Sequence, residues 1–302
     1  MNAIMLHDVR PFNPNFFPLR YQQHSFLTET AFINGLNSIE KKIVDPAVLR
    51  NTIDAETQDG FLLTFDDGLK DHLKVAEILA ERGLKAIFFV PFGILKTKQL
   101  IGSHIIQFLL ASADIKRIAA WLEQRLLDLG YGAQDISNYT RSLWVNNVWS
   151  AEQVFVTRIL RELGTPDIRL KLLDEALSKF FKYDLMQLHE NLYLNITHVE
   201  EIQRMGHTIG AHGWLSCDLR NEPIEVIERE LVFPIVELEK LKIKDHYMSY
   251  ANGGINTLIE SEVKKLSYQF CFGTKHSAIS NFSAERFNLP RFDGTKLELF
   301  HD

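Results

Sequence analysis

Two adjacent carboxylates stand where a short apolar run ends. Residues 61–68 read FLLTFDDG, so Asp66 and Asp67 follow a mainly apolar segment and precede Gly68. Such a run is typical of a strand buried on both faces of a parallel sheet, and α/β proteins place their chemistry beyond the carboxyl ends of such strands. Adjacent side chains leaving a strand diverge, so one carboxylate can bind a metal ion while the other acts as a base. Taken alone, an Asp-Asp-Gly sequence is also an ordinary solvated turn.

Four other groups suited to this chemistry follow or end predicted strands. They are His7 after the apolar residues 3–6, His212 after a strand expected over 207–211, Asn252 in the turn after 248–250, and Arg291 within 288–292. Because the carboxyl ends of parallel strands meet at one edge, these groups can converge on Asp66 and Asp67. A histidine can donate a proton or bind a metal, but His7 alone could equally be a half-buried residue bonded to backbone.

The elements around these groups favour a parallel sheet or barrel. Residues 72–82 repeat apolar side chains with a helical period, Gly83 is suited to end that helix, and residues 86–90 read as the next strand. A strand, helix and strand in this order form a right-handed parallel unit. Further helices are expected over 28–43, 45–51, 198–205, 223–241 and 261–266. Thr197 and Glu200 match a capping box for the third of these, and Pro234 predicts a kink in the fourth.

Residues 95–195 have a different character and are expected to form a helical insertion within a single domain spanning 1–302. Helical periodicity is seen at 100–130, 137–163 and 166–182, and Thr165 with Pro166 is suited to begin the last helix. The insertion is rich in aromatic residues, which could line a cleft but at helical spacing more often belong to a core. These residues are Trp121, Trp144, Trp149, Phe155, Phe180 and Phe181.

The composition excludes several classes of partner. The chain has 302 residues, 46% of them hydrophobic, and a formal net charge of -6. Such a balance offers no basic surface for nucleic acid. No apolar run reaches the length of a membrane span, and the first residues lack the pattern of an export signal, so a cytoplasmic location is expected. Cys217 and Cys271 are too few for a disulfide framework.

The order of these motifs resembles the polysaccharide deacetylase family, the NodB-like carbohydrate esterases. TFDDG at 64–68 matches the family's first motif, GHTIGAHGW at 206–214 is similar to the second, and SYANGG at 249–254 occupies the place of the third. The resemblance covers roughly residues 1–95 and 196–292. An N-terminal strand ending in histidine, as in IMLHDV, is similar to the arrangement in poly-N-acetylglucosamine deacetylases.

The resemblance implies a distorted (β/α) barrel and removal of an N-acetyl or similar acyl group from an acetamido sugar or glycan. It assigns Asp66 as the general base, Asp67 and His212 as metal ligands, and His7 as the general acid, with the backbone amide of Asn252 at the oxyanion. It also implies a divalent metal, zinc or else cobalt or nickel, and a carbohydrate substrate. Arg291 either pairs with Asp66 and orients it or forms an ordinary structural ion pair.

The sequence departs from the family pattern in two places. The second motif normally has a second histidine four residues after the first, and Ser216 stands there. Cys217, Asp218 or water could complete the metal shell instead. In the third motif, Ser249 stands where an arginine is common and Ala251 where a proline is common.

Three functions therefore stay open. The first is a metal-dependent carbohydrate deacetylase. The second is a protein of the same fold that binds glycans without turnover, as the missing histidine suggests. The third is another amidohydrolase, acting on a formyl group or a small cyclic amide. The sequence does not indicate an oligomeric state.

Overall fold

The computed structural model describes residues 1–10, 26–51, 59–112, 114–141, 150–182 and 184–300. The described residues form two compact units. Unit 1 contains the described residues of 1–99 and 185–300, and unit 2 contains those of 100–184.

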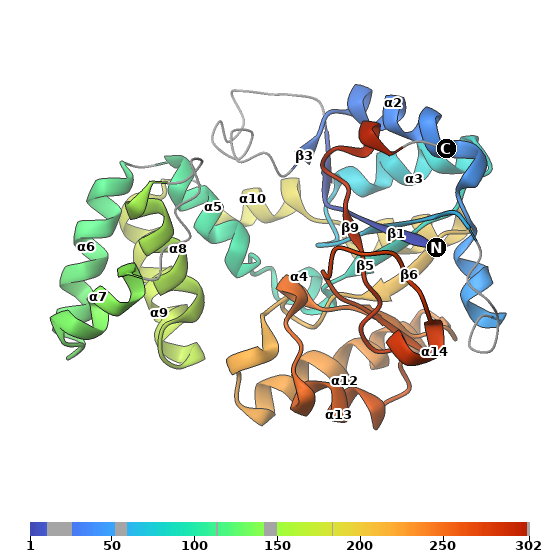
Figure 1. The fold of residues 1–302 in the computed structure, drawn as a ribbon. Helices are drawn as coiled ribbons and strands as arrows, with labels where there is room; N and C mark the ends of the chain where they lie inside the picture. Colours follow the sequence, from blue (N-terminus) through green and yellow to red (C-terminus); the bar gives the residue numbers. More distant parts are fainter. Residues whose placement is uncertain (11–25, 52–58, 113, 142–149, 183, 301–302) are drawn as a thin grey trace. The chain divides into compact units, whose positions relative to one another are not determined.

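Unit 1 is built on a seven-stranded sheet in which every pair of neighbouring strands is parallel. In spatial order its strands are β8 (Phe270–Phe272), β7 (Tyr247–Ser249), β6 (Thr208–Ala211), β5 (Ile87–Val90), β4 (Phe61–Phe65), β1 (Asn2–Leu6) and β9 (Phe292–Asp293). All five residues of β4 are buried, as expected for a strand covered on both faces. The strands form a curled half-barrel surrounded by helices (Figure 1), which confirms the expected distorted (β/α) barrel.

One segment joins the two edges of this sheet. The carbonyl of Arg286 accepts a hydrogen bond from the amide of Cys271 in β8 at 2.9 Å, and Leu289 exchanges two hydrogen bonds with the same edge. A few residues later, Phe292 of β9 pairs with Ile4 of β1. Residues 286–293 therefore bridge both edges and carry Arg291 into the space between them.

The helices of unit 1 surround the sheet, with α2 and α3 on one side and α12 and α13 on another (Figure 1). They are α2 (Glu29–Ile39), α3 (Asp71–Glu81), α4 (Phe92–Thr97), α10 (Leu185–Leu192), α11 (Ile196–Arg204), α12 (Ile224–Lys240), α13 (Thr257–Lys264) and α14 (Phe282–Glu285). Short 3-10 turns are η1 (Glu40–Lys42), η2 (Pro46–Asn51), η3 (Leu219–Asn221), η4 (Ala251–Gly253) and η5 (Leu297–Leu299), and β2 (Asp8–Val9) pairs with β3 (Phe26–Leu27).

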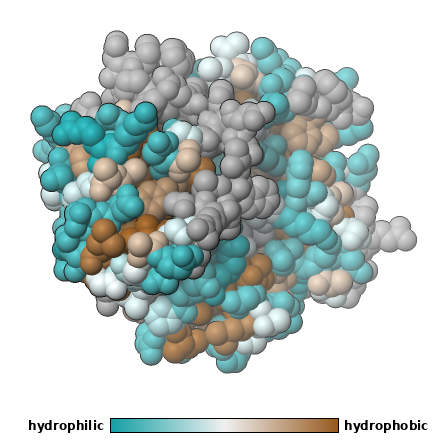
Figure 2. Space-filling model, turned by 60° about the vertical axis from the view of Figure 1, so that its left-hand side comes forward, coloured by the Kyte–Doolittle hydropathy of each residue, from teal (hydrophilic) through white to brown (hydrophobic). Residues whose placement is uncertain are grey.

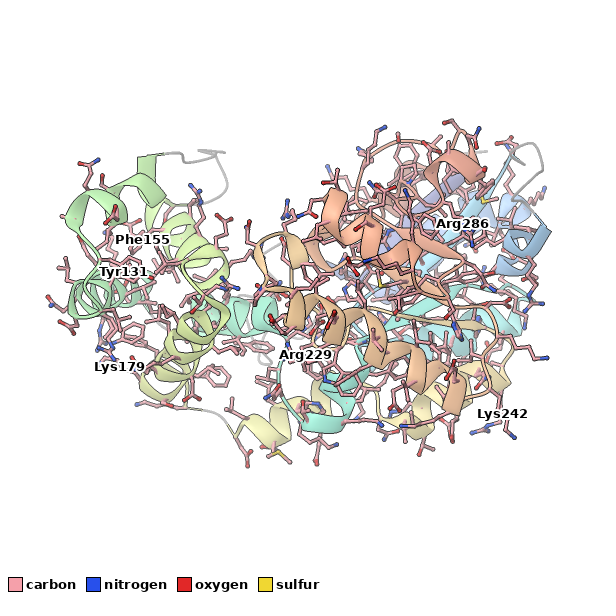
Figure 3. All side chains as sticks on the ribbon, turned by 90° about the horizontal axis from the view of Figure 1, so that it is seen from below. Tyr131, Phe155, Lys179, Arg229, Lys242 and Arg286 are labelled. Atoms are coloured by element: carbon pink, nitrogen blue, oxygen red, sulfur yellow. The ribbon has the colours of Figure 1, made fainter. Side chains whose placement is uncertain are left out.

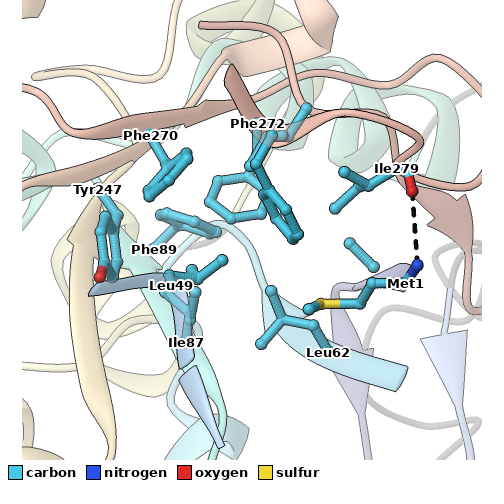
Figure 4. Packing of buried hydrophobic residues seen from close by; sticks show 12 residues of the cluster. Met1, Leu49, Leu62, Ile87, Phe89, Tyr247, Phe270, Phe272 and Ile279 are labelled. Carbon is cyan, nitrogen blue, oxygen red and sulfur yellow. Dashed lines mark hydrogen bonds between the residues drawn. The ribbon is translucent and has the colours of Figure 1, made fainter. Parts of the chain in front are cut away.

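Inward-facing side chains of the strands fill the interior of the curl. Leu62, Ile87, Phe89, Tyr247 and Phe272 are each at most 2% exposed and belong to one buried cluster (Figure 4). Gly210 of β6 leaves room for this packing, since a Cβ there would lie 2.6 Å from the Phe89 ring. The interior is therefore a packed core, and chemistry is confined to the strand ends.

Unit 2 is helical. It consists of α5 (Gly102–Ser112), α6 (Ile115–Asp128), α7 (Ala133–Arg141), α8 (Ala151–Glu162) and α9 (Pro166–Phe180). Thr165 is the N-cap of α9 and Pro166 follows it, as expected. Two of the aromatic residues named above, Phe155 (labelled in Figure 3) and Phe181, are each 7% exposed. Trp121 packs edge-on against Phe180. Trp144 and Trp149 lie outside the described residues.

Helix boundaries differ in part from the expected ones. Within the periodic stretch 137–163 the described residues belong to α7 and α8, and α10 belongs to unit 1. The capping box of α11 is formed by Asn195 and His198, not by Thr197 and Glu200, because the Asn195 side chain already accepts the His198 amide at 2.9 Å. Whether unit 2 is an insertion in one domain stays a prediction.

The described helices and the two cysteines bear on what was expected from the composition. None of the helices within the described ranges is both long and apolar enough to span a bilayer. Cys217 and Cys271 are both free thiols. On the face drawn in Figure 2, hydrophilic and hydrophobic residues are interspersed.

Candidate active site at the strand ends

The parallel register brings the candidate residues to one edge of the sheet. Leu6 and Phe65 are register partners, so His7 and Asp66 are the next residues on two neighbouring strands. The Asp66 amide donates to the Leu6 carbonyl at 2.9 Å, and the His212 amide donates to the Val90 carbonyl at 3.0 Å. These backbone bonds fix where each side chain leaves its strand.

Asp66 is held by a buried network centred on Arg291. Arg291 donates from Nη1 to Asp66 Oδ1 at 2.9 Å and from Nη2 to Asp66 Oδ2 at 2.7 Å. The Ser249 hydroxyl donates to Asp66 Oδ2 at 3.1 Å, and Arg291 also contacts Ser249 Oγ, Thr64 Oγ1 and the Gly273 carbonyl. Asp66 is 2% exposed and Arg291 1% exposed. The carboxylate is therefore fixed in one orientation, with Oδ2 accepting two of these bonds and Oδ1 one.

Asp66 is ionised in this environment. Burial is the largest influence on its pKa and raises it, but the charges of Arg291 and His212, the Arg291 hydrogen bonds and the charge of His7 together lower the pKa below 3.8. A carboxylate that stays ionised has the charge required of a base.

Asp67 turns away from Asp66 and meets His212. Asp67 has a positive φ of 75°, which is uncommon for a residue with a side chain, and Gly68 follows at φ 58°. Its Oδ1 atom lies 3.3 Å from Nε2 of His212. The other ring nitrogen, Nδ1, lies 3.0 Å from the Ser249 carbonyl oxygen. Because a carbonyl oxygen only accepts, Nδ1 must carry a proton.

This arrangement requires a proton or a metal ion between Asp67 and His212. With its proton on Nδ1, a neutral His212 ring directs the Nε2 lone pair at a carboxylate oxygen, which is repulsive unless a proton or a metal ion lies between them. Without a metal, a proton serves: burial lowers the pKa of His212, but the charges of Asp66 and Asp67 outweigh burial and raise it. Two ligand atoms about 2.0–2.1 Å from a tetrahedral zinc ion lie about 3.3 Å apart, and a histidine bonded through its second nitrogen to a carbonyl is typical of metal sites. The pair therefore fits two positions of a metal shell.

Within the described residues no third protein ligand joins Asp67 and His212, because no three histidine, cysteine, aspartate or glutamate residues there are grouped to hold a metal ion. Ser216 is buried with a positive φ of 58°. Burial and the charge of Glu230 raise the pKa of the Cys217 thiol, and Asp218 is paired with Arg220. Neither Cys217 nor Asp218 therefore completes the shell in this conformation.

Asn252 lies in the turn that follows β7, and its proposed role stays a prediction. Asn252 is exposed in η4, with a positive φ of 52°. It follows Ser249 closely in sequence, so it lies on the same strand end. None of the contacts seen among the described residues joins it to Asp66, Asp67 or His212.

Comparisons with solved structures agree with this architecture. The deacetylase PplD from Streptococcus pyogenes, solved with acetate, aligns with a TM-score of 0.59 and 14% identity over 97% of this chain and 91% of that chain. A polysaccharide deacetylase from Bacillus cereus aligns at 0.55 and 13%, over 97% and 64% of the two chains. A de-N-acetylase from Aggregatibacter actinomycetemcomitans aligns at 0.55 and 12%, over 96% and 93%. The chain has the polysaccharide deacetylase fold. No protein-family model and no curated protein matches the sequence.

Within the polysaccharide deacetylase fold, two residues near the cluster were missed by sequence reasoning. His72, at the start of α3, lies 2.9 Å through Nε2 from the His7 carbonyl and donates to it, and burial lowers the His72 pKa to about 4. Ser249 was considered only as a missing arginine, but its hydroxyl bonds Asp66 and its carbonyl bonds His212. A lone histidine in a helix and a serine ending a strand give no sequence signal for these contacts.

Proposed function

We propose that this protein is a divalent-metal-dependent hydrolase that removes an N-acetyl or similar acyl group from an acetamido sugar or glycan. The observation that carries the proposal is the 3.3 Å approach of His212 Nε2 to Asp67 Oδ1, with His212 Nδ1 already bonded to a carbonyl. Asp67 and His212 would hold the ion. A divalent ion such as zinc, cobalt or nickel would supply a water of lowered pKa and polarise the acyl carbonyl.

Asp66 would be the general base. Its pKa is low, so it is a weak base that works only on an acidified water, which is what a neighbouring cation provides. Oδ2 already accepts two hydrogen bonds and Oδ1 accepts one, so Oδ1 is the atom with room to accept a proton.

His7 would be the general acid. Its ring is half-buried at the end of β1, and its charge acts on Asp66. Cleavage of an amide expels an amine, which leaves as a neutral group only if it receives a proton. The imidazolium of His7 can donate that proton, and the amide of Asn252 remains the proposed donor to the oxyanion by resemblance.

Arg291 would orient Asp66. A bidentate guanidinium fixes the plane of a carboxylate, and Arg291 is itself held through Nε by the Gly273 carbonyl at 2.8 Å. This role is favoured over a structural ion pair because the partner of Arg291 is the proposed base itself.

Release of acetate from N-acetylglucosamine oligomers, with zinc, cobalt or nickel added, tests the proposal. The wild type should release acetate, and Asp66→Asn should reduce the rate at least about 100-fold. Asp174→Asn, an exposed residue of unit 2, is the matched control and should keep wild-type activity. Equal rates for wild type and Asp66→Asn would contradict the assignment of Asp66.

A second candidate is a glycan-binding protein without turnover. It is favoured by one observation, that only two ligating side chains meet within the described residues and Ser216 stands at the third position. A chain that purifies without metal, stays inert with each added ion and still binds the oligomers would support this candidate. An amidohydrolase acting on another acyl group would instead be active in a screen of formylated and cyclic amides.

A further inference from the structure

A buried acid outside the proposed active site contacts the loop that follows His212. Glu230 lies in α12 and has no exposed surface. Its Oε2 atom accepts the amides of Trp214 at 2.8 Å and Leu215 at 2.9 Å, and its Oε1 atom also accepts Leu215 at 3.1 Å. Glu230 therefore accepts hydrogen bonds from two backbone amides of residues 213–217, here called the 213–217 loop.

The loop is shaped to receive this carboxylate. Gly213 has a positive φ of 66°, and a Cβ at that position would lie 2.6 Å from Glu230 Oε2. Ser216 also has a positive φ. Buried amides in an irregular loop need acceptors, and here a side chain from a distant helix supplies them. Glycine at 213 and glutamate at 230 are thus matched to each other.

Burial of a carboxyl group at this position does not by itself stabilise the fold. Burial raises the pKa of Glu230, while the two amides, the Cys217 thiol and the neighbouring Arg229 act in the opposite direction. Arg229, labelled in Figure 3, approaches Oε1 only to 3.5 Å. Well-packed apolar side chains commonly stabilise such a site as well as buried ions do. The Glu230 carboxyl group therefore contributes something other than burial, namely acceptors that hold the loop in one conformation.

We propose that Glu230 is a positioning residue for the metal site: it fixes the 213–217 loop that follows His212 and thereby the place of Ser216 in that loop. The link between Glu230 and a metal rests on the proposed function. The claim that Glu230 fixes the 213–217 loop does not. His212 itself is held by the Val90 and Ser249 carbonyls, so Glu230 acts on what surrounds the ion and not on the His212 ring.

The test compares Glu230→Gln with Glu237→Gln in the full chain. Glu237 is on the same helix, 6% exposed and paired with Lys96 and Lys240, and none of its contacts among the described residues reaches the loop. Glutamine keeps the shape of Glu230 but replaces one acceptor oxygen by a donor. Amide hydrogen exchange at Trp214 and Leu215 should become at least about tenfold faster in Glu230→Gln and stay unchanged in Glu237→Gln.

Cobalt binding is the second measurement, because a purely structural role of Glu230 would leave it unchanged. Titration with cobalt(II), followed by its visible absorption, should show about tenfold weaker binding and an altered spectrum for Glu230→Gln alone. Unchanged exchange at Trp214 and Leu215 would overturn the inference. Faster exchange with unchanged cobalt binding would overturn the link to the metal site. If the wild type binds no cobalt, the proposed metal function fails, and the exchange data still decide whether Glu230 fixes the loop.

A second variant serves if Glu230→Gln does not fold. Gly213→Ala would place a Cβ 2.6 Å from Glu230 Oε2 at a position of positive φ. Amide exchange at Trp214 and Leu215 should be several-fold faster in this variant than in the wild type. Unchanged exchange would contradict the match between Gly213 and Glu230.

Discussion

Replacing Arg291 by methionine is the most informative perturbation of the site. Methionine keeps much of the length of arginine and removes its charge, leaving Asp66 buried at 2% exposure without its partner. Breaking one side of a buried ion pair costs about 3–5 kcal/mol of unfolding free energy. The Gly273 carbonyl also loses its donor from Nε. We therefore expect unit 1 to lose about 4 kcal/mol at pH 7.

The size of the loss should depend on pH. In the wild type the pKa of Asp66 is lowered from 3.8, so its stabilising contribution is present above pH 3.8 and is lost as the pH falls through the lower folded value. In Arg291→Met the effect of burial is less opposed, so the folded pKa should rise above 3.8. The unfolding free energy of the variant should then fall as the pH rises. The difference in unfolding free energy between variant and wild type should be larger at pH 7 than at pH 4.5.

Denaturant-dependent hydrogen exchange, measured on peptides from β4 and β7, assays unit 1 separately from unit 2. Asp66→Asn alone leaves Arg291 buried without a counter-charge, so it should also be strongly destabilising. The double variant should be no less stable than either single variant, because the two charges are removed together. Additive losses, or a loss in Arg291→Met that is the same at both pH values, would refute the reasoning.

Three further outcomes are expected. Ser216→His, at a left-handed position that histidine tolerates better than most residues, should tighten zinc binding at least about tenfold in competition with a chromophoric chelator; unchanged affinity would mean that this position does not face the ion. The pKa of His72 falls from 6.5 to about 4 on folding, so unit 1 should lose up to about 3 kcal/mol as the pH drops from 6.5 towards 4, and His72→Gln should reduce that dependence in exchange measurements. Gly210→Ala places a Cβ 2.6 Å from the Phe89 ring and should destabilise unit 1 by about 1–3 kcal/mol in the same assay; wild-type stability would show that the core can adjust.

The sheet could be predicted because its central strands are short runs of mainly apolar residues, which are visible in the sequence alone. Residues 86–90 are all apolar and residues 61–65 are apolar except for Thr64, since both faces of a central parallel strand are buried. The carboxylates after the first run were predicted to stand at a strand end for the same reason. The end of a run is a local feature, and Asp66 and Asp67 follow β4 directly.

Contacts between distant segments were predicted only in part. The pairing of Arg291 with Asp66, 225 positions away, was one of two roles expected for Arg291, but its bidentate geometry depends on residues 286–293, which join both edges of the sheet. Ser249 and Glu230 are ordinary polar residues in a strand and an amphipathic helix, and only the folded sheet brings them to Asp66 and to the loop after His212. The helix start at Asn195 was missed because a later Thr and Glu matched the same capping pattern.

The central claim is that a single cation joins Asp67 and His212, and anomalous diffraction from a crystal soaked with zinc tests it most directly. The account predicts one strong peak about 2.0–2.2 Å from both Asp67 Oδ1 and His212 Nε2. Absence of a peak there, with His212 donating directly to the Asp67 carboxylate, would contradict it.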